Sequence, residues 1–318
     1  MSKQKMSNTK DKNQQSEDNL KRKNSPITRR EIIGAGVVGL VGAATSRNAL
    51  ANTQKPVEPE SGKVNPDGKF KDKVVLITGA TSGIGKATAY AFAKEGALVF
   101  FCGRRQNLGE ANQREIQAFG GEATYMQADV RKESDVRDFI NGCVKKYGRI
   151  DIALNNAGIE APPKTITELS LEEWNNVMAT NATGVFLSMK YEIPVMSRQG
   201  GGIIVNTASV GGHQGFSNIA PYGASKAGIM SLTRTGAMEL TSKNIRVNSF
   251  SPGAVDTPML RRALSSWGMT TATAAKEYPI NRLATAEEMA RVVMWLSSDD
   301  ATIMVGTDID ATGGYLTK

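Results

Sequence analysis

The sequence predicts an α/β protein: one domain with a doubly wound parallel sheet and helices on both faces. Short apolar runs alternate with longer segments of helical period from Phe70 onward, and no repeat or second linker breaks the order. Strands and helices in alternation give βαβ units, which form parallel sheets that bind ligands at the carboxyl ends of the strands. A chain of 318 residues, 40% hydrophobic and 22% charged, can bury one such core.

Six apolar runs are the expected strands, and the segments between them are the expected helices. The strands are Val74–Thr78, Leu98–Cys102, Ala123–Gln127, Ile152–Asn155, Ile203–Thr207 and Arg246–Phe250. The longest helical segments are Trp174–Arg198 and Ala220–Ser242.

The first 69 residues have a different composition. Residues 1–25 are polar, and we expect them to be disordered because so few apolar side chains cannot offset the entropy lost on ordering. Arg29 and Arg30 then precede the apolar run Gly34–Thr45 and the small-residue site Ala49-Leu50-Ala51. That order is typical of a twin-arginine signal peptide, with cleavage after Ala51. The predicted domains are therefore a signal peptide over 1–51, a linker over 52–69 and the folded domain over 70–318.

The alternative for the N-terminal segment is an uncleaved membrane anchor. An apolar run of about 14 residues spans only about 21 Å as a helix, against a hydrocarbon core of about 30 Å. We therefore expect contact with the membrane only during export, and a periplasmic location. A cytoplasmic enzyme that does not use the segment is the other possibility.

Charge and metal-ligand content exclude several functions. The net charge of +8 lies mostly in residues 1–51, with ten basic and four acidic residues, while the remainder is nearly balanced. This balance gives no electrostatic footprint for nucleic acid. Two cysteines, Cys102 and Cys143, and the single His213 cannot build a disulfide framework or a Cys/His metal site, so no metal is expected.

A glycine-rich turn follows the first strand. Thr78-Gly79-Ala80-Thr81-Ser82-Gly83-Ile84-Gly85 leads into a helical segment, Lys86–Glu95. Glycines at a strand-to-helix turn let the backbone approach a pyrophosphate, whose charge the helix N-terminus favours. The sequence thus predicts a dinucleotide site at the first βα turn.

The end of the second strand bears on which dinucleotide binds. Dinucleotide folds that prefer NAD usually place an acidic residue there to accept bonds from the ribose 2′-hydroxyl. Here Gly103 stands at that position and Arg104 and Arg105 follow, and a guanidinium can bind a 2′-phosphate. This favours NADP, with NAD as the alternative if both arginines are only solvated surface charges.

Tyr222 and Lys226 open the helical stretch that follows Pro221. A spacing of four residues puts both side chains on one helix face. A free tyrosine titrates near pH 10, and a nearby ammonium lowers its pKa and favours proton transfer at neutral pH. The pair is therefore a candidate acid/base site, with Ser209 upstream of it.

Together these motifs resemble the short-chain dehydrogenase/reductase family over nearly all of Phe70–Lys318. The resemblance rests on the glycine-rich turn, on Asn155-Asn156-Ala157-Gly158 after the fourth strand, on Asn181, on Ser209 thirteen places before Tyr222, on Lys226, and on Pro252-Gly253 with Thr257. It implies a Rossmann-type fold and an oxidoreductase that moves a hydride between NADP(H) and an alcohol or ketone.

The resemblance also implies a role for each matching residue. Tyr222 would be the general acid or base, Lys226 would lower its pKa and hold the nicotinamide ribose, Ser209 would bind the substrate oxygen, and Asn181 would anchor a water. The implied cofactor contacts are Gly79, Ser82, Gly83, Ile84, Gly85, Arg104, Asp129, Val130, Asn156, Ala157, Gly158, Tyr222, Lys226, Pro252, Gly253, Val255 and Thr257. For Asp129 a strand-end cap is an equally good interpretation.

Two stretches of low charge, Gly211–Ile219 and Met259–Pro279, should shape the substrate pocket. Their apolar side chains make a mainly apolar alcohol or ketone plausible: Phe216, Met259, Leu260, Leu264, Trp267 and Met269. His213 is expected in a wall or at the surface. By analogy with the family, the two longest helices would form a homotetramer or homodimer. An exported nucleotide-binding module without turnover is the alternative function.

Overall fold

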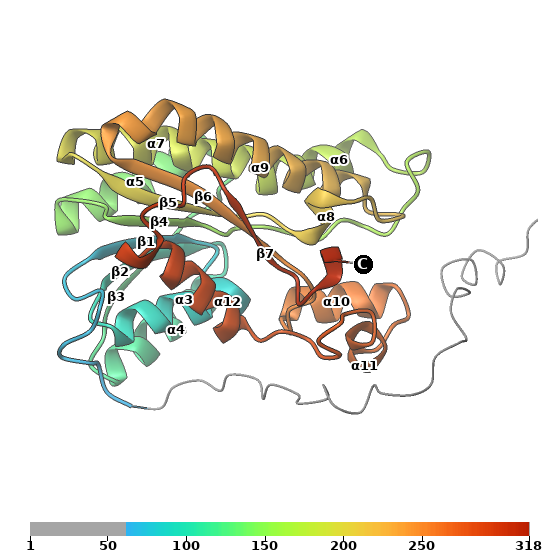
Figure 1. The fold of residues 1–318 in the computed structure, drawn as a ribbon, viewed down its shortest axis with the longest axis horizontal. Helices are drawn as coiled ribbons and strands as arrows, with labels where there is room; N and C mark the ends of the chain where they lie inside the picture. The colour runs from blue at the N-terminus through green and yellow to red at the C-terminus, as the bar shows by residue number, and fades with distance from the viewer. Residues whose placement is uncertain (1–61, 318) are drawn as a thin grey trace, which may run out of the picture. The chain divides into compact units, whose positions relative to one another are not determined.

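A computed structural model of the protein describes residues 62–317. The predicted signal peptide and most of the linker lie outside these residues. The fold is a parallel sheet of seven strands in the order β3-β2-β1-β4-β5-β6-β7 (Figure 1). The strands are β1 (Val74–Thr78), β2 (Leu98–Gly103), β3 (Glu122–Gln127), β4 (Ile152–Asn155), β5 (Gly202–Thr207), β6 (Ile245–Pro252) and β7 (Asp308–Ala311).

Helices cover both faces of the sheet, which confirms the predicted fold class (Figure 1). One face carries α5 (Glu133–Tyr147), α7 (Gly184–Gln199) and α9 (Ala220–Leu240). The other carries α3 (Gly83–Lys94), α4 (Gln106–Ala118) and α12 (Ala286–Leu296). The shorter helices are α6 (Leu171–Met178), α8 (Val210–His213), α10 (Pro258–Ser266) and α11 (Thr271–Ala275), with single turns at Ala179–Thr183, Thr241–Lys243, Asp299–Ala301 and Tyr315–Thr317.

Each face of the sheet has its own apolar core, and the strands supply both because side chains alternate along a strand. In β2, Phe100 belongs to the core under α5 and packs on Phe139 with ring centroids 5.4 Å apart. Its neighbour Phe101 belongs to the opposite core, where Phe92 of α3 is also fully buried. Burial on both faces explains why β1 and β2 are continuous apolar runs.

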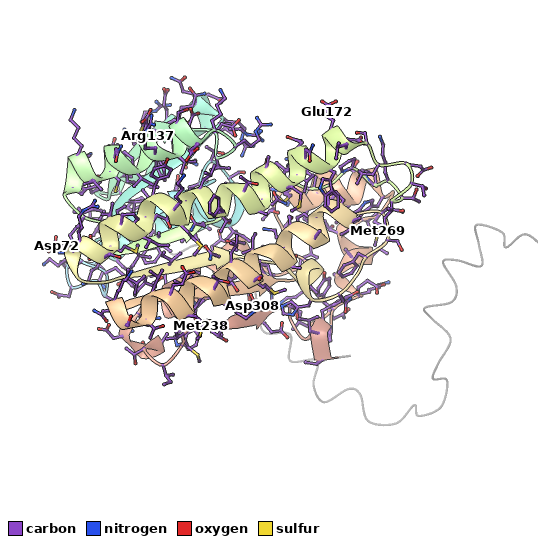
Figure 2. All side chains as sticks on the ribbon, turned by 90° about the horizontal axis from the view of Figure 1, so that it is seen from above. Asp72, Arg137, Glu172, Met238, Met269 and Asp308 are labelled. Carbon is purple, nitrogen blue, oxygen red and sulfur yellow. The ribbon has the colours of Figure 1, made fainter. Side chains whose placement is uncertain are left out.

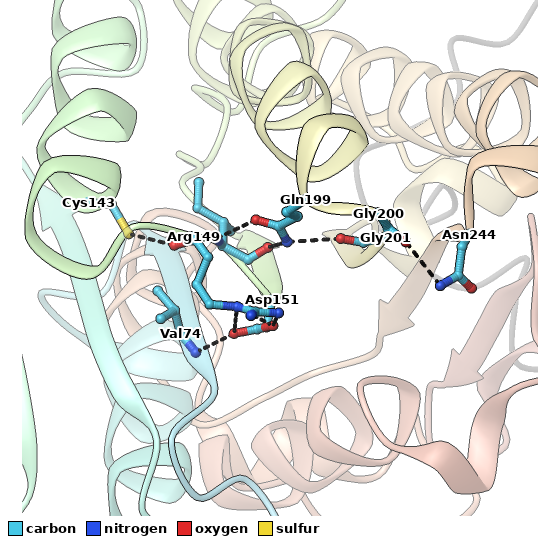
Figure 3. Close-up of polar contacts among 9 residues, drawn as sticks. Val74, Cys143, Arg149, Asp151, Gln199, Gly200, Gly201 and Asn244 are labelled. Carbon is cyan, nitrogen blue, oxygen red and sulfur yellow. Dashed lines mark hydrogen bonds and ion pairs between the residues drawn. The ribbon is translucent and has the colours of Figure 1, made fainter.

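Polar bonds tie the loops together at the amino ends of the strands (Figure 3). The Asp151 carboxylate accepts from the backbone N–H of Val74 at 2.9 Å and from the Arg149 guanidinium. Gln199 bridges the carbonyls of Ile150 and Gly201. These contacts hold together the loops at the amino edge of the sheet, whereas a ligand cleft is expected at the opposite, carboxyl edge.

The sheet order places that cleft. β1 pairs with β2 on one side and with β4 on the other, so consecutive connections run in opposite directions from β1. Ligands in open parallel sheets bind where the strand order reverses, beyond the carboxyl ends. The loops after β1, β4, β5 and β6 all meet there.

Two elements differ from the sequence-based expectation. The predicted helix Trp174–Arg198 is divided into α6 and α7 by a π-helical turn at Ala179–Thr183. The strand β7 was not predicted, because Asp308-Ile309-Asp310-Ala311 is short and half acidic. It forms a sheet edge that pairs only with β6. Within residues 62–317 no helix is both long and apolar enough to span a membrane, and no three metal-ligating side chains gather.

Candidate active site

A cavity of about 950 Å³ opens at the carboxyl ends of the strands. It runs from the glycine-rich turn after β1 to the loops that follow β5 and β6. The residues predicted from the sequence as catalytic or cofactor-binding line this cavity, with the exception of Gly85 and Asn181. The fold therefore brings almost the whole predicted set into one site.

The glycine-rich turn has the geometry of an anion cradle. Gly79 and Gly83 have positive φ angles of 74° and 58°, which side-chain-bearing residues rarely adopt. Ser82 precedes α3 but its side chain does not cap the helix, so the first-turn N–H groups stay available at the positive end of the helix dipole. A pyrophosphate fits this arrangement.

Neighbouring loops hold the turn in place. The Asn156 side-chain amide donates to the carbonyls of Thr78 and Gly79 at 3.3 and 3.2 Å, and Asn112 donates to the carbonyl of Ala80 at 3.0 Å. A Cβ atom on Gly79 would lie 2.6 Å from Cα of Ala157. Asn156 and Ala157 therefore pack against the turn at Thr78 and Gly79, and the turn also borders the cavity.

Arginines gather beside this turn. Arg104 and Arg105 both line the cavity, as does Arg262 of α10. Arg105 donates to the hydroxyls of Thr81 at 2.8 Å and Ser82 at 2.7 Å. Burial, followed by the charges of Arg262 and Arg104, lowers the pKa of Arg105. The sequence favoured Arg104 as the ligand, whereas Arg105 makes the direct contact with the turn.

Gly103 leaves no room for an acidic side chain at the end of β2. A Cβ atom there would lie 2.6 Å from the Thr81 methyl carbon. Asp129, at the end of β3, is engaged by the Arg131 guanidinium at 2.5 Å. Burial acts to raise the pKa of Asp129, but its bonds to Arg131 outweigh burial and the pKa is lowered. Asp129 also accepts from the backbone N–H of Arg131, so it fulfils the capping role as well.

The other cofactor-side residues come from the loop after β6. Pro252 ends β6, Gly253 and Val255 follow, and Thr257 caps α10 by accepting from the backbone N–H of Leu260 at 3.3 Å. A Cβ atom on Gly83 would lie 3.2 Å from the Thr257 methyl carbon. The loop after β6 therefore packs directly against the glycine-rich turn, and both segments line the cavity.

Ser209, Tyr222 and Lys226 lie together in the cavity wall. Ser209 follows β5 by two residues and caps α8 by accepting from the backbone N–H of Gly211 at 3.2 Å. Tyr222 and Lys226 lie one turn apart in α9, with the Lys226 ammonium 5.7 Å from the tyrosine ring centre. The ammonium donates to the carbonyl of Thr207 at 2.7 Å. The side chains therefore meet at the joint between β5 and α9.

Burial controls the protonation of this pair. It raises the pKa of Tyr222, with a hydrogen bond from Ser209 acting in the opposite direction. It lowers the pKa of Lys226 to about 8. Burial outweighs the bond from Ser209, so the pKa of Tyr222 moves upward, and its lowering by the Lys226 ammonium stays a prediction.

Asn181 lies in the π-helical turn and is fully buried. Its side-chain oxygen accepts from the backbone N–H of Ile159 at 2.8 Å, and its amide donates to the Ile159 carbonyl and to the Ser225 hydroxyl. π-turns inside helices often mark functional sites. Here the turn directs the Asn181 side chain toward the loop after β4. Its bonds to Ile159 hold that loop in place beside Gly158.

The far half of the cavity is largely apolar. The side chains predicted for it do line it: Phe216, Met259, Leu260, Leu264, Trp267 and Met269. Sequence reasoning missed Tyr278 and Tyr315, which approach each other across the C-terminal loop with ring centroids 4.9 Å apart. It also missed Glu160, which pairs with Arg262 at 2.7 Å. His213 is not a lining residue; it contacts Asp308 at 2.8 Å and Ser251 at 3.0 Å.

Comparisons with known proteins agree with this geometry. Residues 79–316 match the family described as Enoyl-(Acyl carrier protein) reductase. The chain is 40% identical to cyclohexanol dehydrogenase of Acinetobacter sp. (strain SE19) over 250 residues, covering 79% of this chain and 97% of that protein. It is 37% identical to levodione reductase of Leifsonia aquatica over 257 residues, covering 79% and 96%.

Solved structures show the same fold. The crystal structure of levodione reductase aligns with a TM-score of 0.75 at 36% identity, covering 77% of this chain and 98% of that one. A short-chain type dehydrogenase/reductase from Mycobacterium marinum aligns with a TM-score of 0.74 at 35% identity, covering 79% and 98%. The sheet order, the glycine-rich turn and these matches over most of the chain lead to one conclusion: this protein belongs to the short-chain dehydrogenase/reductase family.

Proposed function

We propose that the protein is an oxidoreductase that transfers a hydride between NADP(H) and an alcohol or ketone, with Tyr222 as the general acid or base. The observation that carries the proposal is one continuous cavity with the glycine-rich turn in one part and Ser209, Tyr222 and Lys226 in another. A pure binding module would have no physical need for a buried lysine beside a cavity-lining tyrosine.

The residues present fit a nicotinamide dinucleotide. The turn from Gly79 to Ile84 would hold the pyrophosphate, Asp129 and Val130 the adenine, and Asn156 to Gly158 with Pro252 to Thr257 the nicotinamide side. When bound, the nicotinamide gives the hydride to the substrate carbon or accepts it. Lys226 reaches the same wall and is the residue expected to hold the nicotinamide ribose.

The proton step belongs to Tyr222. In reduction its phenol O–H donates a proton to the substrate oxygen, and in oxidation the phenolate takes the proton back. The Ser209 hydroxyl lies beside Tyr222 and would bind the same substrate oxygen. A substrate seated against the apolar side chains of α10 therefore presents its oxygen to both residues.

The preference for NADP rests on charge at the end of β2. No carboxylate stands at Gly103, and Arg104 and Arg105, which follow it, line this part of the cavity with positive charge. Guanidinium groups form charge-assisted bonds with phosphate oxygens. A 2′-phosphate would be attracted there, while the ribose 2′-hydroxyl of NAD would lack its usual acceptor.

The direct test is a titration of NADPH and NADH into the purified protein, followed by nicotinamide fluorescence. We expect NADPH to bind at least tenfold more tightly. Equal affinities would leave an NAD-dependent dehydrogenase of the same family, and the failure of both nucleotides to bind would remove the proposal.

Catalysis is tested with Tyr222→Phe against the matched variant Tyr191→Phe. Tyr191 is a half-buried tyrosine of α7 that does not line the cavity, and its hydroxyl contacts Glu133 at 2.8 Å. Loss of the acid or base should lower kcat by 10² to 10⁴ fold for Tyr222→Phe, while NADPH affinity and Tyr191→Phe turnover stay near wild type. Binding of nucleotide with no turnover in any alcohol or ketone tested would point to the binding module.

The substrate class we propose is an apolar cyclic alcohol or ketone. The relatives named above are a cyclohexanol dehydrogenase and a levodione reductase, and the far half of the cavity offers Met259, Leu264 and Trp267 as an apolar wall. Cyclohexanol and cyclohexanone should show a higher kcat/KM than charged open-chain hydroxy acids. The reverse ranking would contradict the apolar wall as the selecting element.

We also propose export by the twin-arginine route and a periplasmic location, on the sequence pattern around Arg29 and Arg30 alone. A route that accepts folded proteins would let the enzyme bind its nucleotide before export. Replacing both arginines with lysine should retain the precursor in the cytoplasm. Unchanged fractionation would favour a cytoplasmic enzyme.

A homotetramer or homodimer is the proposed assembly. The helices α7 and α9 lie side by side across one face, and Met238 lies on the outer side of α9 (Figure 2). Met238 and Phe186 are 86% and 48% exposed, and apolar side chains on outward helix faces suit a subunit interface. Light scattering of the wild type and of Phe186→Glu should give a larger mass for the wild type.

A further inference from the structure

A buried polar network lies beneath the active site, on the side of β4 and β5 that faces α7 and α9. The amide nitrogen of Asn155 donates to Oε2 of Glu192 at 3.1 Å and to Oδ1 of Asn206 at 3.0 Å. The amide of Asn206 donates in turn to the Thr233 hydroxyl at 3.0 Å. Each of these side chains is at most 1% exposed.

The network has more acceptors than donors. Oε1 of Glu192, Oδ1 of Asn155 and the hydroxyl of Ser188 are buried without a hydrogen-bond partner among the described residues. The carboxylate and amide oxygens can only accept, and the single O–H of Ser188 can serve only one of them. Ser188 lies one turn before Glu192 on the same face of α7, and the free Asn155 oxygen belongs to the amide that already contacts the carboxyl. A buried polar atom without a partner is destabilising, so this cluster calls for an additional donor.

The charge of Glu192 is also uncompensated. Glu192 takes part in none of the ion pairs found within residues 62–317. A carboxylate buried without a cation is strongly disfavoured, and protonation removes the charge while creating an O–H donor. One proton therefore resolves both problems.

We propose that Glu192 is a positioning residue that acts as an uncharged carboxylic acid. Its O–H supplies the missing donor, and its Oε2 holds Asn155 and, through Asn155, Asn206 and Thr233. The network thereby fixes the carboxyl ends of β4 and β5 against α7 and α9.

These contacts lie one residue away from the site. Asn155 immediately precedes Asn156, which supports the glycine-rich turn. Asn206 immediately precedes Thr207, whose carbonyl holds the Lys226 ammonium. Ionisation of Glu192 would place a negative charge inside the network and disturb both strand ends. The positioning part of the inference rests on the proposed function, whereas the protonation part does not.

The surroundings of Glu192 support its neutral form. Burial raises its pKa to about 8. The titratable groups on the packed elements are Cys102 of β2 and Cys143 of α5, both buried thiols whose pKa values the glutamate charge helps to raise, and Lys226 of α9, which is bonded to Thr207. The side chains that β4 and β5 contribute to the network around Glu192 are the uncharged amides of Asn155 and Asn206.

The first test is infrared spectroscopy of the wild type against Glu192→Gln, which needs neither nucleotide nor substrate. At pH 6.5 the difference should contain the carbonyl stretch of a protonated carboxylic acid, and it should fade as the pH rises through about 8. The control Glu133→Gln removes a half-exposed carboxylate of α5 and should give no such band. A carboxylate signal from Glu192 at pH 6.5 would overturn the proposal.

Stability gives a second readout that is independent of turnover. The folded pKa of Glu192 lies above its ordinary value of 4.5, so the stabilisation by the neutral acid is complete below pH 4.5 and is lost as the pH rises to about 8. The melting temperature of Glu192→Gln should therefore rise relative to wild type between pH 5 and pH 8. A constant difference across that range would contradict a shifted carboxyl.

The third readout tests positioning. Glu192→Gln keeps an uncharged donor and acceptor and should retain kcat within about twofold, by the near-neutral exchange of matched hydrogen-bonding groups. Glu192→Leu should lower kcat at least tenfold with a smaller change in KM. Lys226 has a pKa of about 8 in both proteins, so the wild-type rate should carry a second ionisation near pH 8 that Glu192→Gln lacks. Identical pH profiles for these two proteins, or wild-type kcat in a folded Glu192→Leu, would refute the positioning role.

Discussion

The choice between NADP and NAD should depend on a single steric contact at the end of β2. An aspartate at position 103 would offer the acceptor that NAD lacks here, but a Cβ atom on Gly103 would lie 2.6 Å from the Thr81 methyl carbon. Thr81 is buried, so the methyl cannot move aside freely. The next Thr81 atoms, its hydroxyl and Cβ, would lie at 3.3 and 3.5 Å. Thr81→Ala therefore makes room for Gly103→Asp.

The magnitude follows from charge and hydrogen bonding. A carboxylate about 5 Å from a 2′-phosphate repels it by about 3 kcal/mol per unit charge at an effective dielectric of about 20. A bond from the ribose hydroxyl to that carboxylate contributes about 1.5 to 3 kcal/mol in favour of NADH. The ratio of the two affinities should move toward NADH by at least about 10²-fold.

The assay is fluorescence titration of both nucleotides into the wild type, Thr81→Ala, Gly103→Asp and the double variant. Gly103→Asp alone should bind both nucleotides poorly because the turn is displaced. Thr81→Ala alone should keep the wild-type preference, since Arg105 retains its bond to Ser82. A double variant that still prefers NADPH by the wild-type ratio would refute the reasoning that charge at this strand end selects the nucleotide.

Three other predictions concern titration and packing. Burial raises the pKa of Tyr222, so its phenol is protonated at neutral pH. Ketone reduction should therefore proceed at pH 7, while alcohol oxidation should speed up as the pH rises. Opposite pH profiles would contradict this. The folded pKa of Lys226 is depressed from 10.5 to about 8, so its buried charge destabilises the fold below pH 8 and this effect fades toward pH 10.5. Lys226→Met should raise the unfolding free energy at pH 7 by up to about 3 kcal/mol in denaturant titrations, less what the lost bond to Thr207 contributes, and the gain should shrink by pH 10.5. Phe92→Ala, at a fully buried ring 4.8 Å from that of Phe70, should lose about 3 to 5 kcal/mol in urea unfolding, whereas exposed Leu171→Ala should change it by less than about 0.5 kcal/mol.

The fold and most of the candidate site could be predicted from the sequence because their signals are local. Five of the six predicted strands are mostly buried runs, and the edge strand β3 is only partly buried. The glycine-rich turn carries its own requirement for positive φ at Gly79 and Gly83. Tyr222 and Lys226 share a helix face by spacing alone. Strand order then follows from βαβ connection rules, which bring these segments to one edge of the sheet.

What could not be predicted depends on tertiary contacts. Two adjacent arginines follow β2, and the sequence does not show which of them turns toward Thr81 and Ser82. Arg105 does so because it lies directly before α4 in an extended conformation. Glu192 has the composition of an exposed helix position, yet α7 packs over β4 and β5 and buries it completely. Tyr278 and Tyr315 reach the cavity from segments without a periodic pattern.

Near the carboxyl end of the sheet, three titratable groups are buried in a low-dielectric interior: Glu192, Lys226 and Tyr222. Burial moves the pKa of Glu192 up to about 8, that of Lys226 down to about 8 and that of Tyr222 upward, in each case toward the neutral form. Desolvation acts on all three in this way because it penalises whichever form carries the charge. None of these groups stabilises the fold by its charge, and the two apolar cores beside the sheet supply the stability instead. Under the proposed function, Tyr222 would exchange its proton beside an uncharged Glu192 network and a Lys226 ammonium held by the Thr207 carbonyl.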